Sequence, residues 1–143
     1  MKFDRLKEIR EEKNLTQREV ADALEVDRST YAGWETGKDT IPLRRLNKLS
    51  DYYKISVDYM TGLSNVTSSY RVIDLDAKVI GQNLKEFRKE RNLVQKDIFL
   101  FLNTTSSTYS AYETGKVLIK TDFLYSICKN YNASMDELLG KKN

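Results

Sequence analysis

Hydrophobic residues in the first sixty positions recur every three or four residues, which is the period of amphipathic helices rather than of strands. Phe3, Leu6 and Ile9 form the first such stripe, and charged residues fill the positions between them. No segment alternates with period two for long. The pattern predicts an all-α unit of five short helices. The four later segments with helical spacing are Val20–Leu24, Tyr31–Trp34, Leu43–Tyr53 and Ser56–Gly62.

Polar residues, glycine and proline indicate where these helices begin and end. Thr16 and Glu19 have the spacing of a capping box, so a helix is expected to follow Thr16. Asp27 is a good N-cap for the next helix, and Gly37 is suited to ending it. Pro42 is expected to be the first residue of the fourth helix, because its fixed φ suits that position.

The same pattern occurs twice along the chain. The segment "LKEIREEKNLTQ" at Leu6–Gln17 returns as "LKEFRKERNLVQ" at Leu84–Gln95, 78 residues later. The segment "STYAGWETGK" at Ser29–Lys38 returns with the same offset as "STYSAYETGK" at Ser107–Lys116. A unit repeated at a fixed offset predicts two domains of one fold. The predicted boundaries are a first domain at 1–63, a Ser/Thr-rich flexible linker at 64–77 and a second domain at 78–143.

The composition narrows the class of protein. With no His and a single Cys128, the chain has no intramolecular disulfide and no cysteine-based zinc site. It has no Gly-rich phosphate loop and no apolar run long enough to cross a bilayer. We therefore expect a protein without a cofactor, a metal or a membrane partner, and not an enzyme. The net charge of +3 is too small to indicate a polyanionic partner by itself.

Two short helices joined by about four residues, the second tied down by aromatic residues, make a helix-turn-helix. The segment Gln17–Thr36, with "LTQREVADAL" followed by "STYAGWETGK", closely resembles the Cro and phage-repressor type of helix-turn-helix domain, the XRE family. Gln95–Thr114 resembles it similarly. The resemblance implies two tandem five-helix, lambda-repressor-like domains. It also implies sequence-specific binding of double-stranded DNA by a bacterial or phage-type transcriptional regulator, with repression favoured, in the bacterial cytosol at the nucleoid.

The predicted DNA contacts of the first domain lie on and around the recognition helix, Asp27–Thr36. Its N-terminal end is expected in the major groove, where Arg28 has the donors to bind a guanine edge. The resemblance places Gln17 against phosphate or a base edge, bracing the recognition helix. Tyr31 and Trp34 are expected in the core. The full set of predicted DNA-binding residues in this domain is Thr16, Gln17, Arg28, Ser29, Thr30, Gly33, Thr36, Lys38 and Arg44.

The second domain departs from the pattern. Val94 replaces Thr16, so the capping box is expected to be lost, and Phe99 stands where Ala21 packs between the two helices. One hypothesis is that this domain still binds DNA, mostly through contacts with the DNA phosphate backbone and with weak hydroxyl readout of the bases. The other is that it forms a homodimer or docks on a partner through Phe99, Leu100 and Phe101. Its predicted DNA-binding residues are Gln95, Ser106, Ser107, Thr108 and Lys116.

The resemblance further implies a structural ion pair between the first and third helices of each domain. These pairs are Arg10 with Glu35 and Arg88 with Glu113. A role in protein interaction, as an antitoxin-like or anti-regulator protein on the same fold, is the alternative function. Its support is the neutral first half, which has 12 Lys and Arg and 12 Asp and Glu through Val66 out of totals of 24 and 21. RNA binding is a third possibility, although no aromatic platform or GXXG loop supports it.

Overall fold

The computed structural model describes residues 1–67 and 70–142. Ser68 and Ser69 of the predicted linker, and Asn143 of the second predicted domain, lie outside the described residues. The chain divides into two compact units, residues 1–69 and 70–143. The described residues form ten helices and no strand, which confirms the all-α prediction.

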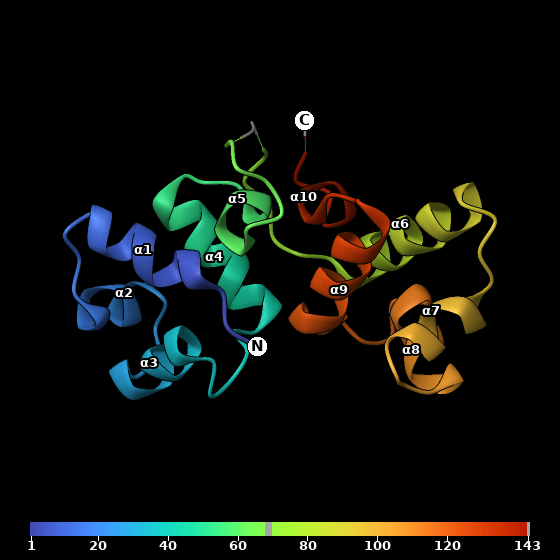
Figure 1. Ribbon diagram of the computed structural model, residues 1–143, viewed down its shortest axis with the longest axis horizontal. Helices are drawn as coiled ribbons and strands as arrows, with labels where there is room; N and C mark the ends of the chain where they lie inside the picture. Colours follow the sequence, from blue (N-terminus) through green and yellow to red (C-terminus); the bar gives the residue numbers. More distant parts are fainter. Residues whose placement is uncertain (68–69, 143) are drawn as a thin grey trace. The chain divides into compact units, whose positions relative to one another are not determined.

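Unit 1 contains five helices, drawn in blue to green in Figure 1. The second and third, joined by a short turn, form the predicted helix-turn-helix. Helix α2 packs against α3, and α1 contacts both α3 and α5. The helices are α1 (Asp4–Glu12), α2 (Gln17–Ala23), α3 (Arg28–Thr36), α4 (Leu43–Tyr53) and α5 (Val57–Thr61).

The helix ends of unit 1 agree with the predicted signals in part. Thr16 accepts a hydrogen bond from the Glu19 amide, and the Glu19 carboxylate accepts one from the Thr16 amide, so the capping box is present. Gly37 ends α3 with a φ of 83°, a conformation that costs other residues energy. Asp27 is the N-cap of α3 as predicted, although its side chain makes no capping bond. One expectation was wrong, because Pro42 precedes α4 as its N-cap instead of being its first residue.

Unit 2 repeats the arrangement with a longer first helix. Asp76 caps α6 by accepting from the amides of Lys78 and Val79, so this helix begins a turn earlier than α1 does in the repeat. The helices are α6 (Ala77–Glu90), α7 (Gln95–Phe101), α8 (Ser106–Glu113), α9 (Thr121–Tyr131) and α10 (Met135–Leu138).

The start of α7 corrects the expectation for Val94. Valine has no oxygen to accept from the Asp97 amide, but the Asp97 carboxylate accepts from the Val94 amide at 2.8 Å. Half of the capping box therefore survives, because the reciprocal bond needs only the backbone of the N-cap residue.

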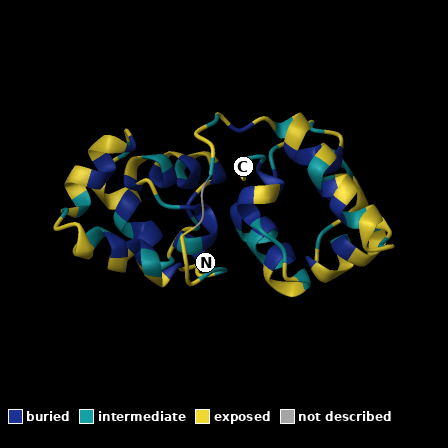
Figure 2. Ribbon diagram, turned by 90° about the horizontal axis from the view of Figure 1, so that it is seen from above, coloured by how far each residue is buried: buried dark blue, intermediate teal, exposed yellow. Residues whose placement is uncertain are grey.

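Each unit encloses a hydrophobic core of its own. In Figure 2 the buried parts of the helices face one another within each unit and the exposed parts face outward. Leu6, Val20 and Tyr31 are fully buried in unit 1, and Leu84, Ile98 and Tyr109 occupy the corresponding places in unit 2. The core therefore follows the hydrophobic stripes that the sequence repeats.

Gly81 allows the longer helix α6 to lie against α8. A Cβ at this position would stand 2.6 Å from the Glu113 carbonyl oxygen and would also meet the carbonyl oxygen of Tyr112. Both are backbone atoms, which cannot turn aside as a flexible side chain would. The close approach of the two helices thus depends on the missing side chain.

We expect Gly81→Ala to lower the free energy of unfolding of unit 2 by about 1–3 kcal/mol, the usual cost of overpacking. Urea denaturation followed by circular dichroism measures this change. Lys85→Ala, an exposed substitution on the same helix, is the control and should leave stability almost unchanged. Equal stability of the two variants would contradict the proposed close contact.

Candidate nucleic-acid interface

Helix α3 places its aromatic residues inward and its first polar residues outward. The rings of Tyr31 and Trp34 are buried and meet edge to face, with centroids 6.0 Å apart. Arg28, Ser29 and Thr30, in the first turn, are exposed. The N-terminal end of α3 therefore presents side chains with hydrogen-bonding groups to solvent.

A buried ion pair connects α1 to α3. The Arg10 guanidinium donates from Nε to Glu35 Oε2 at 2.6 Å and from Nη2 to Glu35 Oε1 at 3.0 Å. The Glu35 side chain is 3% exposed and that of Arg10 is 11% exposed. Arg10 also donates to the Leu15 carbonyl at 2.8 Å, which fixes the loop that leads into α2.

The same carboxylate begins a chain of hydrogen bonds that leads to the surface. Gln17, the first residue of α2, donates from Nε2 to Glu35 Oε1 at 3.0 Å. Its amide oxygen accepts from Arg28 Nη1 at 2.9 Å. The bond to Glu35 fixes which end of the Gln17 amide faces inward. The exposed Arg28 guanidinium is therefore held by a chain that ends at the Arg10–Glu35 pair.

Opposing effects set the protonation of Glu35. Burial alone would raise the pKa of this carboxyl, but the hydrogen bonds donated by Arg10 and Gln17 outweigh burial and hold its pKa below the ordinary value. The Tyr31 hydroxyl approaches the same carboxylate without forming a hydrogen bond of normal geometry. Burial first, and then the nearby carboxylate, raise the pKa of Tyr31 well above its usual range.

The remaining predicted DNA-binding residues of unit 1 differ in which hydrogen-bonding groups they present to solvent. The Thr16 hydroxyl accepts the capping bond and keeps its own hydrogen to donate. The Thr36 hydroxyl donates to the Gly33 carbonyl at 3.2 Å, so its donor is already used within the protein. Lys38, just after α3, and Arg44, in the first turn of α4, are exposed.

Gly33 is the one predicted contact that is buried. The Asp39 carboxylate lies over it, 3.4 Å from the place where a Cβ would stand, and the Asp39 amide donates to the Gly33 carbonyl at 3.2 Å. A negative charge therefore lies between Gly33 and solvent.

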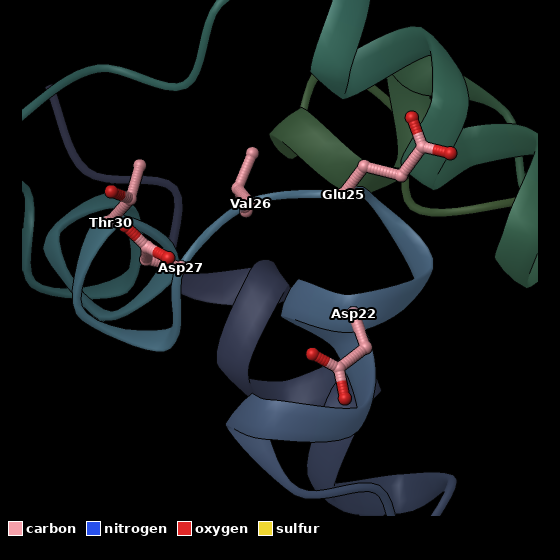
Figure 3. A pocket seen from close by; sticks show the side chains of 5 residues that line it. All are labelled: Asp22, Glu25, Val26, Asp27 and Thr30. Carbon is pink, nitrogen blue, oxygen red and sulfur yellow. The ribbon is translucent and has the colours of Figure 1, made fainter.

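An acidic hollow that was not among the predicted features lies beside the recognition helix. It has a volume of about 490 Å³ and lies around the turn between α2 and α3, as Figure 3 shows. Three carboxylates in this hollow would repel a phosphate backbone on that side of α3. A comparison of the two repeats does indicate these carboxylates. Unit 2 has the uncharged residues Leu100, Asn103 and Thr105 at the three positions that are acidic in unit 1. The lining residues are Asp22, Glu25, Val26, Asp27 and Thr30.

Unit 2 contains the same chain of hydrogen bonds between buried side chains, but it lacks the arginine at the outer end. Arg88 Nε donates to Glu113 Oε2 at 2.8 Å, and Gln95 Nε2 donates to Glu113 Oε1 at 3.1 Å. Burial opposes ionisation of Glu113, but the bonds from Arg88 and Gln95 hold its pKa below the ordinary value. Ser106 stands at the position of Arg28, so no arginine extends this chain to the surface.

Hydroxyl groups replace charged groups at the start of α8. The Thr105 hydroxyl accepts from the Thr108 amide at 3.2 Å and donates to the Thr108 hydroxyl at 2.9 Å. It also lies 3.3 Å from the Ser107 hydroxyl. Ser106 and Ser107 are exposed, as is Lys116 beyond the end of α8. This end of unit 2 is rich in hydroxyls that are partly used within the protein.

The apolar residues predicted for a partner contact lie at the end of α7. Leu100 is 60% exposed and Phe101 is 44% exposed, whereas Phe99 is half-buried. Phe101 meets the Tyr131 ring at 6.1 Å between centroids. Phe99 thus lies only partly within the packed space that Ala21 occupies fully in unit 1.

Two family models match the chain, one in each unit. Residues 6–60 match a helix-turn-helix model, and residues 81–143 match a helix-turn-helix domain model. The two matches support the tandem arrangement predicted from the repeat.

Several relatives are named HTH-type transcriptional regulators. The uncharacterized HTH-type transcriptional regulator YobD of Bacillus subtilis is 33% identical over 93 residues, which cover 65% of this chain and 76% of YobD. The HTH-type transcriptional regulator ImmR of the same organism is 31% identical over 99 residues, covering 69% and 72%. The regulator AnsR, also from Bacillus subtilis, is 32% identical over 95 residues, covering 60% and 82%. No solved structure gave a significant match.

The chain therefore belongs to the XRE-type family of helix-turn-helix transcriptional regulators, with two tandem domains. Its function is sequence-specific DNA binding in transcriptional regulation. This assignment points to a DNA-binding regulator rather than an enzyme. Within residues 1–67 and 70–142, no cluster of three or more His, Cys, Asp or Glu could hold a metal, and no helix is long and apolar enough to span a membrane.

We expect unit 1 to lose stability in acid through Glu35. Because its pKa in the folded state lies below the ordinary 4.5, the stabilisation is complete above about pH 4.5 and disappears as pH falls through the folded pKa. Glu35→Gln should lower the free energy of unfolding at neutral pH by about 3–5 kcal/mol, because Arg10 loses its partner. It should also weaken the acid dependence.

Urea denaturation between pH 3 and pH 7 measures both effects. Glu8→Gln, which removes an exposed carboxylate from α1, is the matched control and should keep the wild-type dependence. An unchanged pH profile in Glu35→Gln would show that this carboxylate does not control acid stability.

Proposed function

We propose that unit 1 reads its DNA site by inserting the N-terminal end of α3 into the major groove. The single observation that carries the proposal is the exposed Arg28 guanidinium, held at 2.9 Å by Gln17. Four of its five N–H donors remain for a guanine edge, which arginine binds through two of them. Ser29 and Thr30, exposed beside it, add hydroxyl contacts to neighbouring bases.

The DNA backbone is proposed to run across both ends of the helix-turn-helix, away from the acidic hollow. At one end, the Thr16 hydroxyl and the second amide hydrogen of Gln17 donate to phosphate, next to the positive N-terminus of α2. At the other end, Lys38 and Arg44 contact the opposite strand, and Thr36 joins them when its hydroxyl turns from the Gly33 carbonyl to a phosphate. The carboxylates around Asp27 discourage other placements, because phosphate there would meet like charge.

Unit 2 is proposed to bind DNA as well, mainly through phosphates. Lys116 and the nearby Lys120 are exposed, and the positions that form the acidic hollow of unit 1 are uncharged in unit 2. Hydroxyls at Ser106, Ser107 and Thr108 replace arginine, so base discrimination by this unit is expected to be weaker. Since the two units carry different groups, one chain should prefer an asymmetric site.

A homodimer through unit 2 is the second candidate for this half. The observation that favours it is the adjacent exposure of Leu100 and Phe101, with Phe99 partly exposed beside them. A dimer formed there would place two copies of unit 1 on a palindromic site.

Repression is the proposed sign of regulation. A chain that occupies the major groove of a promoter prevents other proteins from using the same groove. We place this activity at the bacterial nucleoid, where the target DNA lies.

Arg28→Ala is expected to weaken binding to a selected site by about 1–3 kcal/mol and to relax the preference at one base pair. Arg28→Lys keeps the charge but loses the planar fork, so it should recover affinity for random duplex and not the base preference. Fluorescence anisotropy on the selected site and on random duplex measures both, with Lys7→Ala as a charge-matched control on α1. Equal losses on both duplexes in Arg28→Ala would mean that Arg28 contacts only phosphate.

The role of unit 2 is tested by salt dependence. If Lys116 and Lys120 contact phosphates, the double alanine variant should lower the slope of log K against log salt by up to about 1.8, at roughly 0.9 per contact. Alanine at the exposed Lys85 and Lys89 of α6 is the matched control. An unchanged slope, together with dissociation of a dimer by Leu100→Ser in analytical ultracentrifugation, would assign unit 2 to dimerisation.

A further inference from the structure

Arg5 of α1 holds the segment that leaves unit 1. Its Nη1 donates to the carbonyl oxygens of Tyr59, at 2.8 Å, and of Ser64, and its Nη2 donates to the side chain of Asn65 at 2.5 Å. The guanidinium also lies over the Tyr59 ring, 4.5 Å from its centroid. The Ser64 amide donates back to the Asp58 carbonyl at 3.1 Å. The chain is therefore fixed to unit 1 as far as Asn65.

The end of the chain holds the segment that enters unit 2. Tyr70 and Lys142 form an antiparallel bridge, and the Arg71 amide donates to the Lys141 carbonyl. Arg71 Nη2 donates to the Gly140 carbonyl at 3.0 Å. Residues 70 and 71, which the sequence assigned to a linker, are thus part of unit 2.

The fold alone does not require the contacts of Arg5 beyond α5. The corresponding residue of the repeat is Asn83, which donates to the Leu138 carbonyl at 3.0 Å. Asn83 thus holds the end of α10, as Arg5 holds Tyr59 of α5, while the bonds to Ser64 and Asn65 are particular to unit 1. These bonds hold the first residues of the segment that connects the two units.

We call the contacts of Arg5 with Ser64 and Asn65 the first clamp, and those of Tyr70 and Arg71 with residues 140–142 the second clamp. The two clamps shorten the part of the connector that is able to extend. Only residues 66–69 separate Asn65 from Tyr70, and five residue steps cover at most about 18 Å. Without the clamps, the stretch from Thr61 to the buried Leu75 would comprise fourteen steps, or about 48 Å when fully extended. The reach of a connector decides which pairs of sites two linked modules can bind together.

We propose that Arg5 is a specificity-determining residue that does not touch DNA. It holds one end of the connector, while the backbone bonds of Tyr70 and Arg71 hold the other. Arg5 thereby limits the separations between two half-sites that one chain binds at once. This inference rests on the proposed function, in which both units contact DNA.

The clamp is tested first without DNA, by hydrogen exchange of the full chain. In Arg5→Ala, peptides that cover residues 62–67 should exchange at least tenfold faster than in the wild type. Lys7→Ala removes the same charge from an exposed position on the same helix and should exchange as the wild type does. Equal exchange in the two variants would overturn the clamp, whatever the chain does with DNA.

The effect on specificity is tested by selection from a random-sequence duplex library. The wild type and Lys7→Ala should enrich two motifs at one fixed spacing. Arg5→Ala, and a chain with six Gly and Ser residues inserted between Val66 and Thr67, should enrich the same motifs over several spacings. The insertion leaves both clamps intact, so it remains informative if Arg5→Ala folds poorly.

A single retained spacing in the insertion chain would overturn the spacing role, and so would enrichment of only one motif by the wild type. Failure of every chain to enrich any motif would remove the proposed function together with this inference. The hydrogen-exchange result would still stand alone, which separates the two failures.

Discussion

The buried carboxylate of Glu35 is the group on which the arrangement of unit 1 depends. It accepts hydrogen bonds from Arg10 on α1 and Gln17 on α2, while itself belonging to α3, so one charge joins three helices. A buried charge is tolerated only when it is paired and hydrogen-bonded, and this requirement fixes the relative positions of the helices. Gln17 then passes this constraint to Arg28 at the surface. The interior of the domain thereby sets the position of the side chain that we propose contacts a base.

Unit 2 shows that the buried hydrogen bonds around the glutamate stay the same while the exposed side chains change. Glu113 accepts from Arg88 and Gln95 in nearly the same geometry as Glu35 does from its partners. The group at the surface is nevertheless a serine, and the acidic hollow is absent at the equivalent positions. One fold therefore carries two different surfaces, because the buried hydrogen bonds do not depend on which side chain stands at the surface.

In the proposed mode of binding, in which both units of one chain contact DNA, a covalent connection replaces a second subunit. Joining two binding units raises the effective concentration of the second only over distances that the connector covers. Arg5 and the final residues of unit 2 both act on this distance, by contacts within one unit each. If both units bind DNA as proposed, spacing specificity is a property of packing at the ends of α1 and α10, far in sequence from the recognition helices.

The sequence by itself determined the all-α class, the tandem repeat, the capping box at Thr16 and the helix end at Gly37, because each depends on local periodicity or on the conformation of a few neighbouring residues.

Only the tertiary structure decided the rest of the candidate site. The bond between Arg28 and Gln17, the Asp39 carboxylate over Gly33 and the acidic hollow join residues from different elements, and local pattern carries no distance between them. The error at Pro42 has the same origin, since a residue suited to a helix start takes the position that packing gives it. The extension of both units into the predicted linker was hidden for the same reason, because it depends on Arg5 and on the last residues of the chain.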